Sequence, residues 1–569
     1  MTSPNFAPDA PKSSSTPLET IDALVVKLRQ NKDRWVRTTN ERRAELLERC
    51  IDRTKSVAEE WVAAACKAKG LDPRAPQAGE EWLGGPMCVV RNLRMFAEAV
   101  RADGQPPLPA THRRPDGQMV AEIFPANLID KLTFTGFSAE VWIEPGKELT
   151  QGRIYREKAR GKLGDGKVAL VLGAGNVASI GPMDALYKLF VEDEVVIVKT
   201  NPVNAYLLPF WEEAFRPLVD EGVLAVVRGG ADVGKHLVNH PDVDTIHITG
   251  SDRTHDAIVW GGDPDEQARR KASGEKVLTK PISSELGAVT PVFVVPGPWE
   301  KDDIEFQARN VVGMVANNAS FNCNAAKILV TARGWPEREK FLERVEYHLE
   351  RAAPRQAYYP GAQQRYDGFL EHYSQSKPLG PRSKAVVPWT IIEDVPAKKG
   401  EYALTNEAFC GVLAETRLDA SNPGDFLRLA TELGNDVCWG TLSCVILIHP
   451  ATEKQYAKQL DAALAGLRYG GIAVNCFAGV IYALVSPTWG AFPGHTDEDI
   501  QSGRGVVHNG YMIDHPQKSI VRAPFRINPT PVWFADHRTA QDVGRQMVQM
   551  EANPTLLRLP PLAIAALRG

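Results

Sequence analysis

The chain has 569 residues, enough for about four domains of ordinary size or for fewer large ones. Hydrophobic residues make up 43% of the chain and charged residues 24%, which is typical of a globular protein rather than a disordered or fibrous one. Its 66 basic and 70 acidic residues leave a net charge of -4, so charge gives no case for nucleic acid or an anionic membrane as a partner.

The cysteines and the first residues indicate a cytoplasmic protein. Eight cysteines are too few for a disulfide framework in a chain of this length, and they lack the paired spacing of a zinc site. Residues 1–19 are rich in proline and serine and contain no apolar signal region, so we expect a disordered lead-in. No apolar run is long enough for a membrane span. The histidines are expected to be structural, and no metal site is predicted.

The first predicted element is a helix, because apolar residues recur at the spacing of one helical face: Ile21, Leu24, Val25 and Leu28. A second helix is predicted to begin with a capping box formed by Thr38 and Glu41. Residues 117–160 then alternate between polar and apolar, which predicts strands and hairpins that include the segment LTFTGFSAEVWIE.

From residue 167 the pattern becomes strand, helix, strand, which indicates parallel strands joined by crossover helices. We therefore expect a nucleotide-binding α/β unit over 167–290 and a second α/β stretch from about 291 to 505. The segment 515–540, with SIVRAPF and PTPVWFA, is again strand-like and could return to the hairpins near 130–155. The tail from 541 starts as a helix, and its last residues are left unassigned.

A glycine-rich turn follows the first strand of the nucleotide-binding unit. Its sequence, Gly173-Ala174-Gly175-Asn176-Val177-Ala178, has the form GxGxxA of a dinucleotide-binding turn. That motif also needs an acidic residue about 20 positions on to hold the ribose, and the next strand ends in Lys199 instead. A Rossmann dehydrogenase acting on alcohols is therefore a weak interpretation, and it gives Cys323 no role.

Three further residues are candidates for chemistry. Cys323 lies among polar residues before a predicted strand, and a nucleophilic thiolate needs such partial exposure. Glu285 precedes a Leu-Gly pair, which suggests a close approach of the backbone. Glu407 lies in a loop with no distinguishing pattern of its own. Taken singly, each is more often structural than catalytic.

As an ordered set, these residues resemble the aldehyde dehydrogenase superfamily over roughly residues 20 to 535. The family's oxyanion asparagine matches Asn176, and its strand-end lysine matches Lys199. The family's Glu-Leu-Gly-Gly motif matches the segment from Glu285, its nucleophilic cysteine matches Cys323, and its Glu-x-Phe-Gly-Pro motif is similar to the segment from Glu407. The family's glycine-rich turn and the segments after it match further positions, namely Gly229, Gly234, Gly250 and Ser251.

The resemblance implies an NAD- or NADP-dependent oxidation of an aldehyde to an acid through a thioester on Cys323. Asn176 and the Cys323 backbone N–H would stabilise the oxyanion, and Glu285 would be the general base for water. Lys199 would hold the adenosine ribose and Glu407 the nicotinamide ribose. Ser251 would lie near the pyrophosphate, and Gly229, Gly234 and Gly250 would line the cofactor site.

The departures from the family pattern leave alternatives open. The acidic residue that favours NAD in many members is replaced by Pro202, so NADP remains plausible. The segment GAGNVASIGP is also similar to acyl-CoA reductases, which makes a CoA-acylating enzyme the alternative. Such enzymes commonly lack the base, so the presence of Glu285 favours hydrolysis. A second alternative is a catalytically silent dinucleotide-binding scaffold.

The resemblance also implies the architecture, an α/β fold of the aldehyde dehydrogenase type with two doubly wound domains and a small β-hairpin oligomerisation domain. The expected cofactor domain comprises 20–128 and 161–290, and the catalytic domain 291–510. The expected hairpin domain comprises 129–160 and 511–540, with a tail over 541–569. Because that hairpin joins subunits in the family, we expect a homodimer or homotetramer.

Overall fold

The computed structural model describes residues 15–569, so the expected lead-in lies mostly outside the described residues. Two helices follow, α1 (Leu18–Val36) and α2 (Asn40–Ala68). The N-cap of α2 is Thr39, whose hydroxyl accepts a 3.3 Å hydrogen bond from the Arg42 backbone N–H. The predicted capping box of Thr38 and Glu41 is therefore wrong by one residue, because Thr38 instead donates its hydroxyl to the carbonyl of Arg34.

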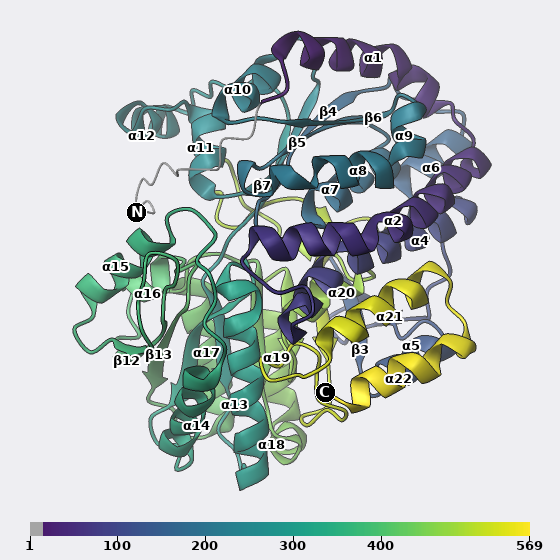
Figure 1. Cartoon of the computed structure of the whole chain (residues 1–569). Helices are drawn as coiled ribbons and strands as arrows, with labels where there is room; N and C mark the ends of the chain where they lie inside the picture. The colour runs from purple at the N-terminus through teal and green to yellow at the C-terminus, as the bar shows by residue number, and fades with distance from the viewer. Residues whose placement is uncertain (1–14) are drawn as a thin grey trace.

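A six-stranded sheet forms the upper half of the molecule as drawn in Figure 1. Its order is β17 (Gly503–Arg504), β8 (Ile282–Leu286), β7 (Thr245–Gly250), β4 (Val168–Leu172), β5 (Val195–Thr200) and β6 (Leu224–Arg228). All neighbours are parallel except β17 and β8. Strands β4 and β5 are buried along their whole length, which explains their apolar runs VALVL and VVIV.

Helices cover both faces of this sheet (Figure 1). On one side lie α1 and α10 (Ala231–Asn239), and on the other α7 (Ile180–Phe190) and α8 (Leu208–Ala214). The strand order reverses at β4, between β5 and β7, and in doubly wound sheets ligands bind at such a switch point, outside the carboxyl ends of the strands. Asn176 follows β4, Lys199 lies at the end of β5, and Ser251 follows β7, so all three meet at this edge.

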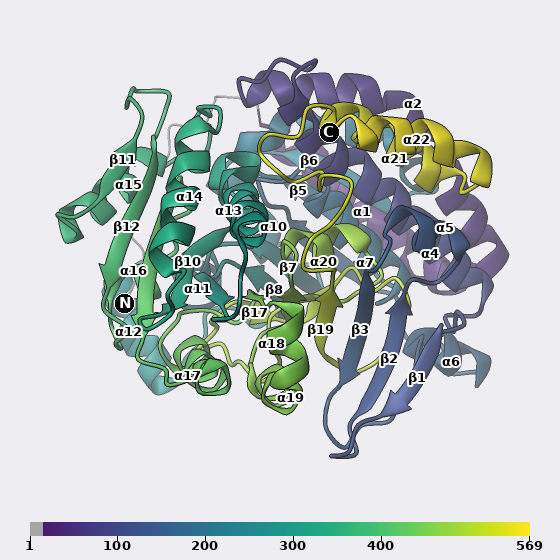
Figure 2. The ribbon, with the colours of Figure 1, turned by 90° about the horizontal axis from the view of Figure 1, so that it is seen from below.

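The second sheet has eleven strands. Its order is β1 (Ala110–Arg113), β2 (Met119–Phe124), β3 (Ser138–Ile143), β19 (Pro516–Arg522), β15 (Gly471–Val474), β14 (Ser443–Leu447), β9 (Thr290–Val294), β10 (Ala326–Ala332), β13 (Val412–Leu418), β12 (Trp389–Val395) and β11 (Lys377–Leu379). The strands from β19 to β12 are parallel, while both ends of the sheet are antiparallel. Figure 2 shows β1, β2 and β3 continuing the sheet away from the catalytic half.

Further helices pack around this second sheet. They are α13 (Lys301–Ala316), α14 (Arg338–Arg351), α15 (Ala362–His372), α16 (Tyr402–Thr405), α17 (Pro423–Asp436), α18 (Pro450–Gln455), α19 (Ala457–Gly466) and α20 (Gly479–Leu484). A two-stranded ribbon of β16 (Trp489–Gly490) and β18 (Val506–Val507) brings Trp489 to the site described below.

Two segments predicted as strands are not strands. The LTFT part of the first lies in and after α5 (Leu128–Thr133), because the Asn127 side chain accepts from the Asp130 backbone N–H and starts a helix there. The segment PTPVWFA forms turns, and its aromatic residues pack on α13: Trp533 donates its indole N–H to Asn310 at 2.9 Å. Proline at 529 and 531 removes backbone donors that a strand would need.

The tail forms α21 (Ala540–Ala552) and α22 (Leu559–Leu567), drawn in yellow in Figures 1 and 2. α21 crosses α3 (Gly79–Trp82) so closely that a β-carbon at Gly544 would lie 2.4 Å from Trp82. Glu551 of α21 pairs with Arg91 at 2.7 Å and with Arg94 at 2.6 Å, both on α4 (Cys88–Arg101). Burial opposes ionisation of Glu551, but these two cations hold its pKa below the usual range.

Among the helices that the structure describes, none combines the length and the apolar character needed to cross a bilayer.

Candidate active site

The loop that carries Cys323 joins the end of α13 to the start of β10. Three successive residues in it, Asn318, Ala319 and Ser320, have φ angles of 52°, 54° and 67°. Left-handed backbone at residues other than glycine costs on the order of 1–3 kcal/mol each and persists only where the surroundings enforce it. The loop is therefore held in a strained shape immediately before the cysteine.

Hydrogen bonds of the Asn318 side chain hold the loop in this shape. Its amide nitrogen donates to the carbonyl of Asn176 at 2.9 Å and to the side-chain oxygen of Asn322 at 2.9 Å. Its side-chain oxygen accepts from Lys69 Nζ at 3.0 Å and from the Tyr358 hydroxyl at 2.8 Å. Every polar atom of this side chain is bonded, so the left-handed turn is fixed to the parts of the chain around it.

A buried lysine joins this loop to the turn after β4. Lys69 Nζ pairs with Glu81 at 2.8 Å and donates to the carbonyl of Asn176 at 3.0 Å. The sequence prediction missed Lys69, Glu81 and Asn318 as parts of the site. No local signal could have found Lys69, because it reaches Asn176 and Asn318 across 107 and 249 positions of chain, and Glu81 belongs to the site only through Lys69.

Asn176 contacts the cysteine loop through one specific hydrogen bond. Its side-chain nitrogen donates to the carbonyl of Phe321 at 2.9 Å, two residues before Cys323. An amide nitrogen has two hydrogens, so one remains for a second acceptor on the cysteine side. The geometry brings the predicted oxyanion donor and the predicted nucleophile to one place.

Cys323 is partly exposed, whereas the other seven cysteines are buried. Its thiol lies in hydrogen-bonding contact with the Glu285 carboxyl group. Desolvation, and then the negative charges of Glu285 and Glu407, raise the pKa of the Cys323 thiol well above its ordinary value. The cysteine therefore rests as a thiol and needs a base to become a nucleophile.

Glu285 lies near the end of β8 and is buried. Burial raises the pKa of Glu285 to about 8, against a hydrogen bond from Trp489 that lowers it. That bond runs from the Trp489 indole N–H to Oε1 and is 2.9 Å long. A carboxyl group with a pKa near neutrality is suited to accepting and releasing protons at physiological pH.

Glu407 packs against the backbone that links the two sheets. A β-carbon at Gly287 would lie 2.1 Å from Glu407 Oε2, so only glycine fits there, and the Ala288 backbone N–H bonds to the same carboxylate. Desolvation raises the pKa of Glu407 to about 7, against the opposing charges of Lys327 and Arg365. Its Oε1 atom is buried and has no partner in the described structure.

The predicted cofactor residues line the edge of the first sheet. Burial lowers the pKa of Lys199 to about 8, and its ammonium group donates to the Thr200 carbonyl at 3.0 Å. A β-carbon at Gly234 would lie 3.6 Å from Lys199 Cε, so this glycine leaves room beside the lysine stem. Gly229 lies in the turn between β6 and α10, where a β-carbon would meet Val233 at 2.4 Å.

Gly250 ends β7, and Ser251 is the N-cap of α11 (Asp252–Trp260), where its hydroxyl accepts from the Thr254 N–H at 3.2 Å. These residues fit NAD or NADP. Lys199 offers a cation at the crevice, the helix start offers N–H groups to phosphate, and the unpartnered Glu407 Oε1 offers an acceptor to a ribose hydroxyl.

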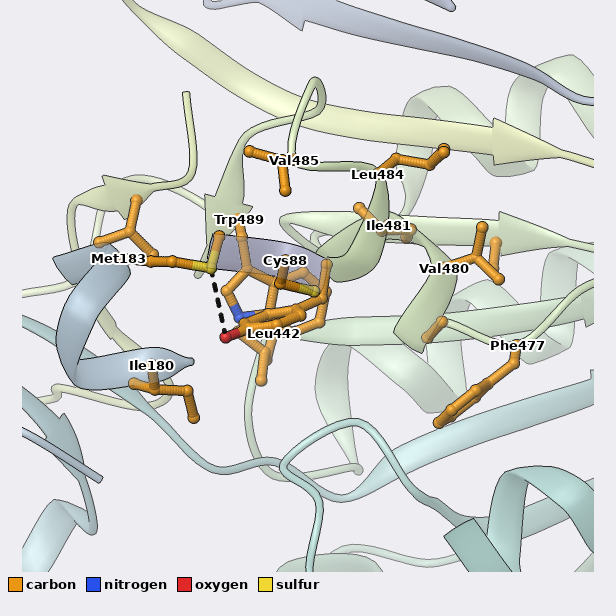
Figure 3. Packing of buried hydrophobic residues seen from close by; sticks show 14 of the residues in the cluster. Cys88, Ile180, Met183, Leu442, Phe477, Val480, Ile481, Leu484, Val485 and Trp489 are labelled. Carbon is orange, nitrogen blue, oxygen red and sulfur yellow. Dashed lines mark hydrogen bonds between the residues drawn. The ribbon is translucent and has the colours of Figure 1, made fainter. Parts of the chain in front are cut away.

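A cavity of about 320 Å³ opens onto Cys323. Its walls are mostly apolar and include three residues labelled in Figure 3, namely Phe477 and, from α20, Val480 and Leu484. Ile180 and Met183 of α7 lie on the opposite side in that view, and the Met183 sulfur accepts from the Tyr482 hydroxyl at 3.9 Å. The cavity is within the usual size range for a small-molecule site.

The prediction of no metal site overlooked one histidine pair. His236 of α10 and His240, the C-cap of that helix, lie with their ring nitrogens and the Asp22 carboxylate within 4.8 Å of one another. However, His240 Nδ1 accepts from the Asp242 backbone N–H at 3.1 Å, which leaves the proton on Nε2. That nitrogen faces Asp22 at 3.5 Å, and His236 Nε2 lies 2.6 Å from the same carboxylate, so we interpret the cluster as a hydrogen-bonded network.

Comparison with known proteins agrees with this geometry. The model of the Aldehyde dehydrogenase family matches residues 195–358. N-succinylglutamate 5-semialdehyde dehydrogenase of Sphingopyxis alaskensis is 27% identical over 267 residues, which are 45% of this chain and 50% of the relative. Aldehyde dehydrogenase NAD(P)+ 1 of Saccharomyces cerevisiae is 24% identical over 42% of this chain and 47% of its own. The chain thus spans about half the length of these curated relatives.

Solved structures match over most of the chain. The aldehyde dehydrogenase KauB from Pseudomonas aeruginosa superposes with a TM-score of 0.61, covers 90% of both chains and is 17% identical. An indole-3-acetaldehyde dehydrogenase crystallised with NAD+ gives a TM-score of 0.58, 89% coverage of both chains and 18% identity. At this identity the structures show a shared fold, which is the α/β architecture that the sequence predicts.

Proposed function

We propose that this chain, a member of the aldehyde dehydrogenase superfamily, oxidises an aldehyde to a carboxylic acid with NAD or NADP and forms a thioester on Cys323. One observation supports the proposal most strongly. The partly exposed Cys323 thiol contacts the Glu285 carboxyl, whose pKa of about 8 lets it take up and release protons.

The first step uses only residues of this chain. Glu285 in its ionised form takes the thiol proton of Cys323, and the sulfur then attacks the carbonyl carbon of the aldehyde. The negative charge moves to the carbonyl oxygen, where the second hydrogen of the Asn176 amide and the Cys323 backbone N–H can stabilise it. Losing one such donor typically costs about 2.7–4 kcal/mol of barrier.

A nicotinamide cofactor held at this crevice would supply the hydride acceptor needed to oxidise the hemithioacetal on Cys323 to a thioester. Glu407 would hold its ribose, and Lys199 the ribose at the adenosine end. Glu285 must then lose the proton it took from the thiol before it can activate water. Attack of that water on the thioester breaks the carbon–sulfur bond, releases the acid and restores Cys323.

A first experiment follows NAD(P)H absorbance with a panel of aldehydes, with NAD or NADP, and with or without CoA. The proposal expects turnover without CoA that is lost in Cys323→Ala, while the variant still binds cofactor. Turnover that requires CoA would instead support a CoA-acylating enzyme. Cofactor binding without turnover of any aldehyde would support the silent scaffold.

A further inference from the structure

The tail of the chain forms part of the wall of the cavity in front of Cys323. Its lining includes Val543 and Met547 of α21 and Leu562 and Ala566 of α22. The same cavity includes Cys323 itself, so the space between the nucleophile and the tail is continuous. A substrate whose carbonyl reaches the sulfur must direct the rest of its chain toward these two helices.

The charged side chains of the lining are already paired. Lys69 bonds to Glu81, and Glu80 bonds to Arg355 at 2.8 Å. The remaining charged residue of the lining is Arg91, which bonds to Glu551 at 2.7 Å and to the carbonyl of Leu484 at 2.6 Å. Among the described residues of the lining, none therefore offers a free charge to a substrate carboxylate, phosphate or ammonium group.

Most other lining residues are aliphatic or aromatic and come from several elements: Leu83, Met87, Phe134, Val177, Val480 and Ile527. Neutral apolar walls favour neutral apolar ligands, because burying an unpaired charge against them is costly. A semialdehyde bearing a carboxylate would find no free lysine or arginine among the described residues of the lining, although His537 Nε2 lacks a partner there.

Helices α5 and α22 pack against each other, lie side by side in Figure 1, and both contribute residues to the lining of the cavity. Leu132 of α5 lines the cavity and is also 53% exposed. On α22, Leu562 and Ala566 line the cavity, while Ile564 and Leu567 have 52% and 70% of their surface exposed. Exposed aliphatic residues of both helices thus adjoin residues of the lining, and an apolar ligand would meet them if it entered on this side.

We infer that the substrate is an uncharged aldehyde with a long aliphatic chain, which enters between α5 and α22 and packs its chain against α21 and α22. This inference rests on the proposed function and specifies its substrate class. Each methylene group buried in the cavity should raise kcat/KM about fourfold, the fold-change that corresponds to about 0.8 kcal/mol per buried methylene.

The test measures kcat/KM for straight-chain aldehydes from acetaldehyde to hexadecanal, with benzaldehyde and succinic semialdehyde for comparison. We expect kcat/KM to rise with chain length until the cavity is filled, and succinic semialdehyde to be poor. Turnover that falls with chain length, or that favours benzaldehyde or the semialdehyde, would overturn the inference and leave the proposed function standing. Failure of every aldehyde would overturn the proposed function itself.

A matched pair of variants tests whether the aliphatic chain of the substrate lies in the cavity. Ala566→Trp fills the cavity from α22 and should cut kcat/KM for long aldehydes at least tenfold more than for acetaldehyde. Ala563→Trp makes the same substitution on the exposed side of the same helix and should leave the length profile unchanged. Equal profiles in the two variants would contradict the inference, and Met547→Trp on α21 repeats the test should Ala566→Trp fail to fold.

Discussion

The indole N–H of Trp489 donates a 2.9 Å hydrogen bond to the buried carboxylate of Glu285. Trp489 comes from a two-residue strand about two hundred residues further along the chain, and its bond lowers a pKa that burial raises to about 8. The tryptophan thus keeps the proposed base ionisable near neutral pH.

Trp489→Phe should therefore raise the pKa of Glu285 further. Hydrogen bonds to charged groups contribute about 1.5–3 kcal/mol, which corresponds to a shift of about one to two pH units. The pH profile of thioester hydrolysis should rise through about 8 in the parent enzyme and at a higher pH in the variant, with similar plateaus. An unmoved profile would mean that Glu285 is not the titrating base.

Glu285→Gln should make the protein more stable at pH 8 while it slows hydrolysis. In the folded chain the Glu285 carboxyl keeps its proton until about pH 8, whereas in the unfolded chain it ionises near its ordinary pKa of 4.5. The free energy of unfolding of the parent protein therefore falls as pH rises from 4.5 to 8. Glutamine does not ionise, so the variant does not lose stability in this way. The gain at pH 8 should be a few kcal/mol (on the order of 2–4), and near zero at pH 5, by denaturant titration.

Asn176→Ala should lower kcat about 100- to 1000-fold, the usual effect of removing one oxyanion donor. The variant also removes the bond to the Phe321 carbonyl, so a purely structural role must be tested separately. Two measurements test the structural role: the rate of Cys323 alkylation by iodoacetamide and the dissociation constant of the cofactor. If these change as much as kcat does, Asn176 positions the loop and does not stabilise the oxyanion.

Lys199→Met should weaken cofactor binding about tenfold or more, because one charged hydrogen bond is lost. At saturating cofactor, kcat should change little. Since the pKa of Lys199 is lowered to about 8, the affinity of the parent enzyme should decline as pH rises through that value. Lys235→Met, an exposed lysine on the same side of the sheet edge, is the matched control in fluorescence titrations of NADH.

Glu551→Ala should destabilise the protein by about 3–5 kcal/mol, since it leaves the buried Arg91 with no carboxylate nearer than Asp130 at 4.0 Å. Because the pKa of Glu551 is held below its ordinary value, this stabilisation is complete at neutral pH and is lost as pH falls through the lowered pKa. Glu59→Ala breaks an exposed pair with Arg545 of the same helix α21 and should cost under about 1 kcal/mol. Equal effects on the denaturation midpoint would contradict this account of the tail.

The alternation of strands and helices over 167–290 could be predicted because it depends on local periodicity, and both sheets bury their central strands. The failures have local causes too. Asn127 starts a helix where the apolar pattern suggested a strand, and the prolines at 529 and 531 prevent another strand. The sequence pattern indicates which residues are apolar, but it does not indicate which elements they pack against.

The chemical residues could be predicted only as an ordered set, since each has a common structural role on its own. The structure brings Glu285 to the Cys323 thiol and Asn176 to the Cys323 loop. The residues that hold this arrangement, Lys69 and Asn318, were beyond prediction. Their bonds join segments up to 249 positions apart, and no spacing in the sequence records such contacts.

Two separate segments of the sequence supply the reacting groups and part of the cavity wall. The Cys323 thiol, the proposed base Glu285 and the proposed oxyanion donor Asn176 lie between residues 176 and 323, whereas Val543, Met547, Leu562 and Ala566 of the cavity wall come after residue 540. Recombination or mutation in that last segment could exchange one aldehyde for another without altering a single reacting group. A library confined to α21 and α22, selected on different aldehydes, is therefore a direct route to new selectivity at constant chemistry.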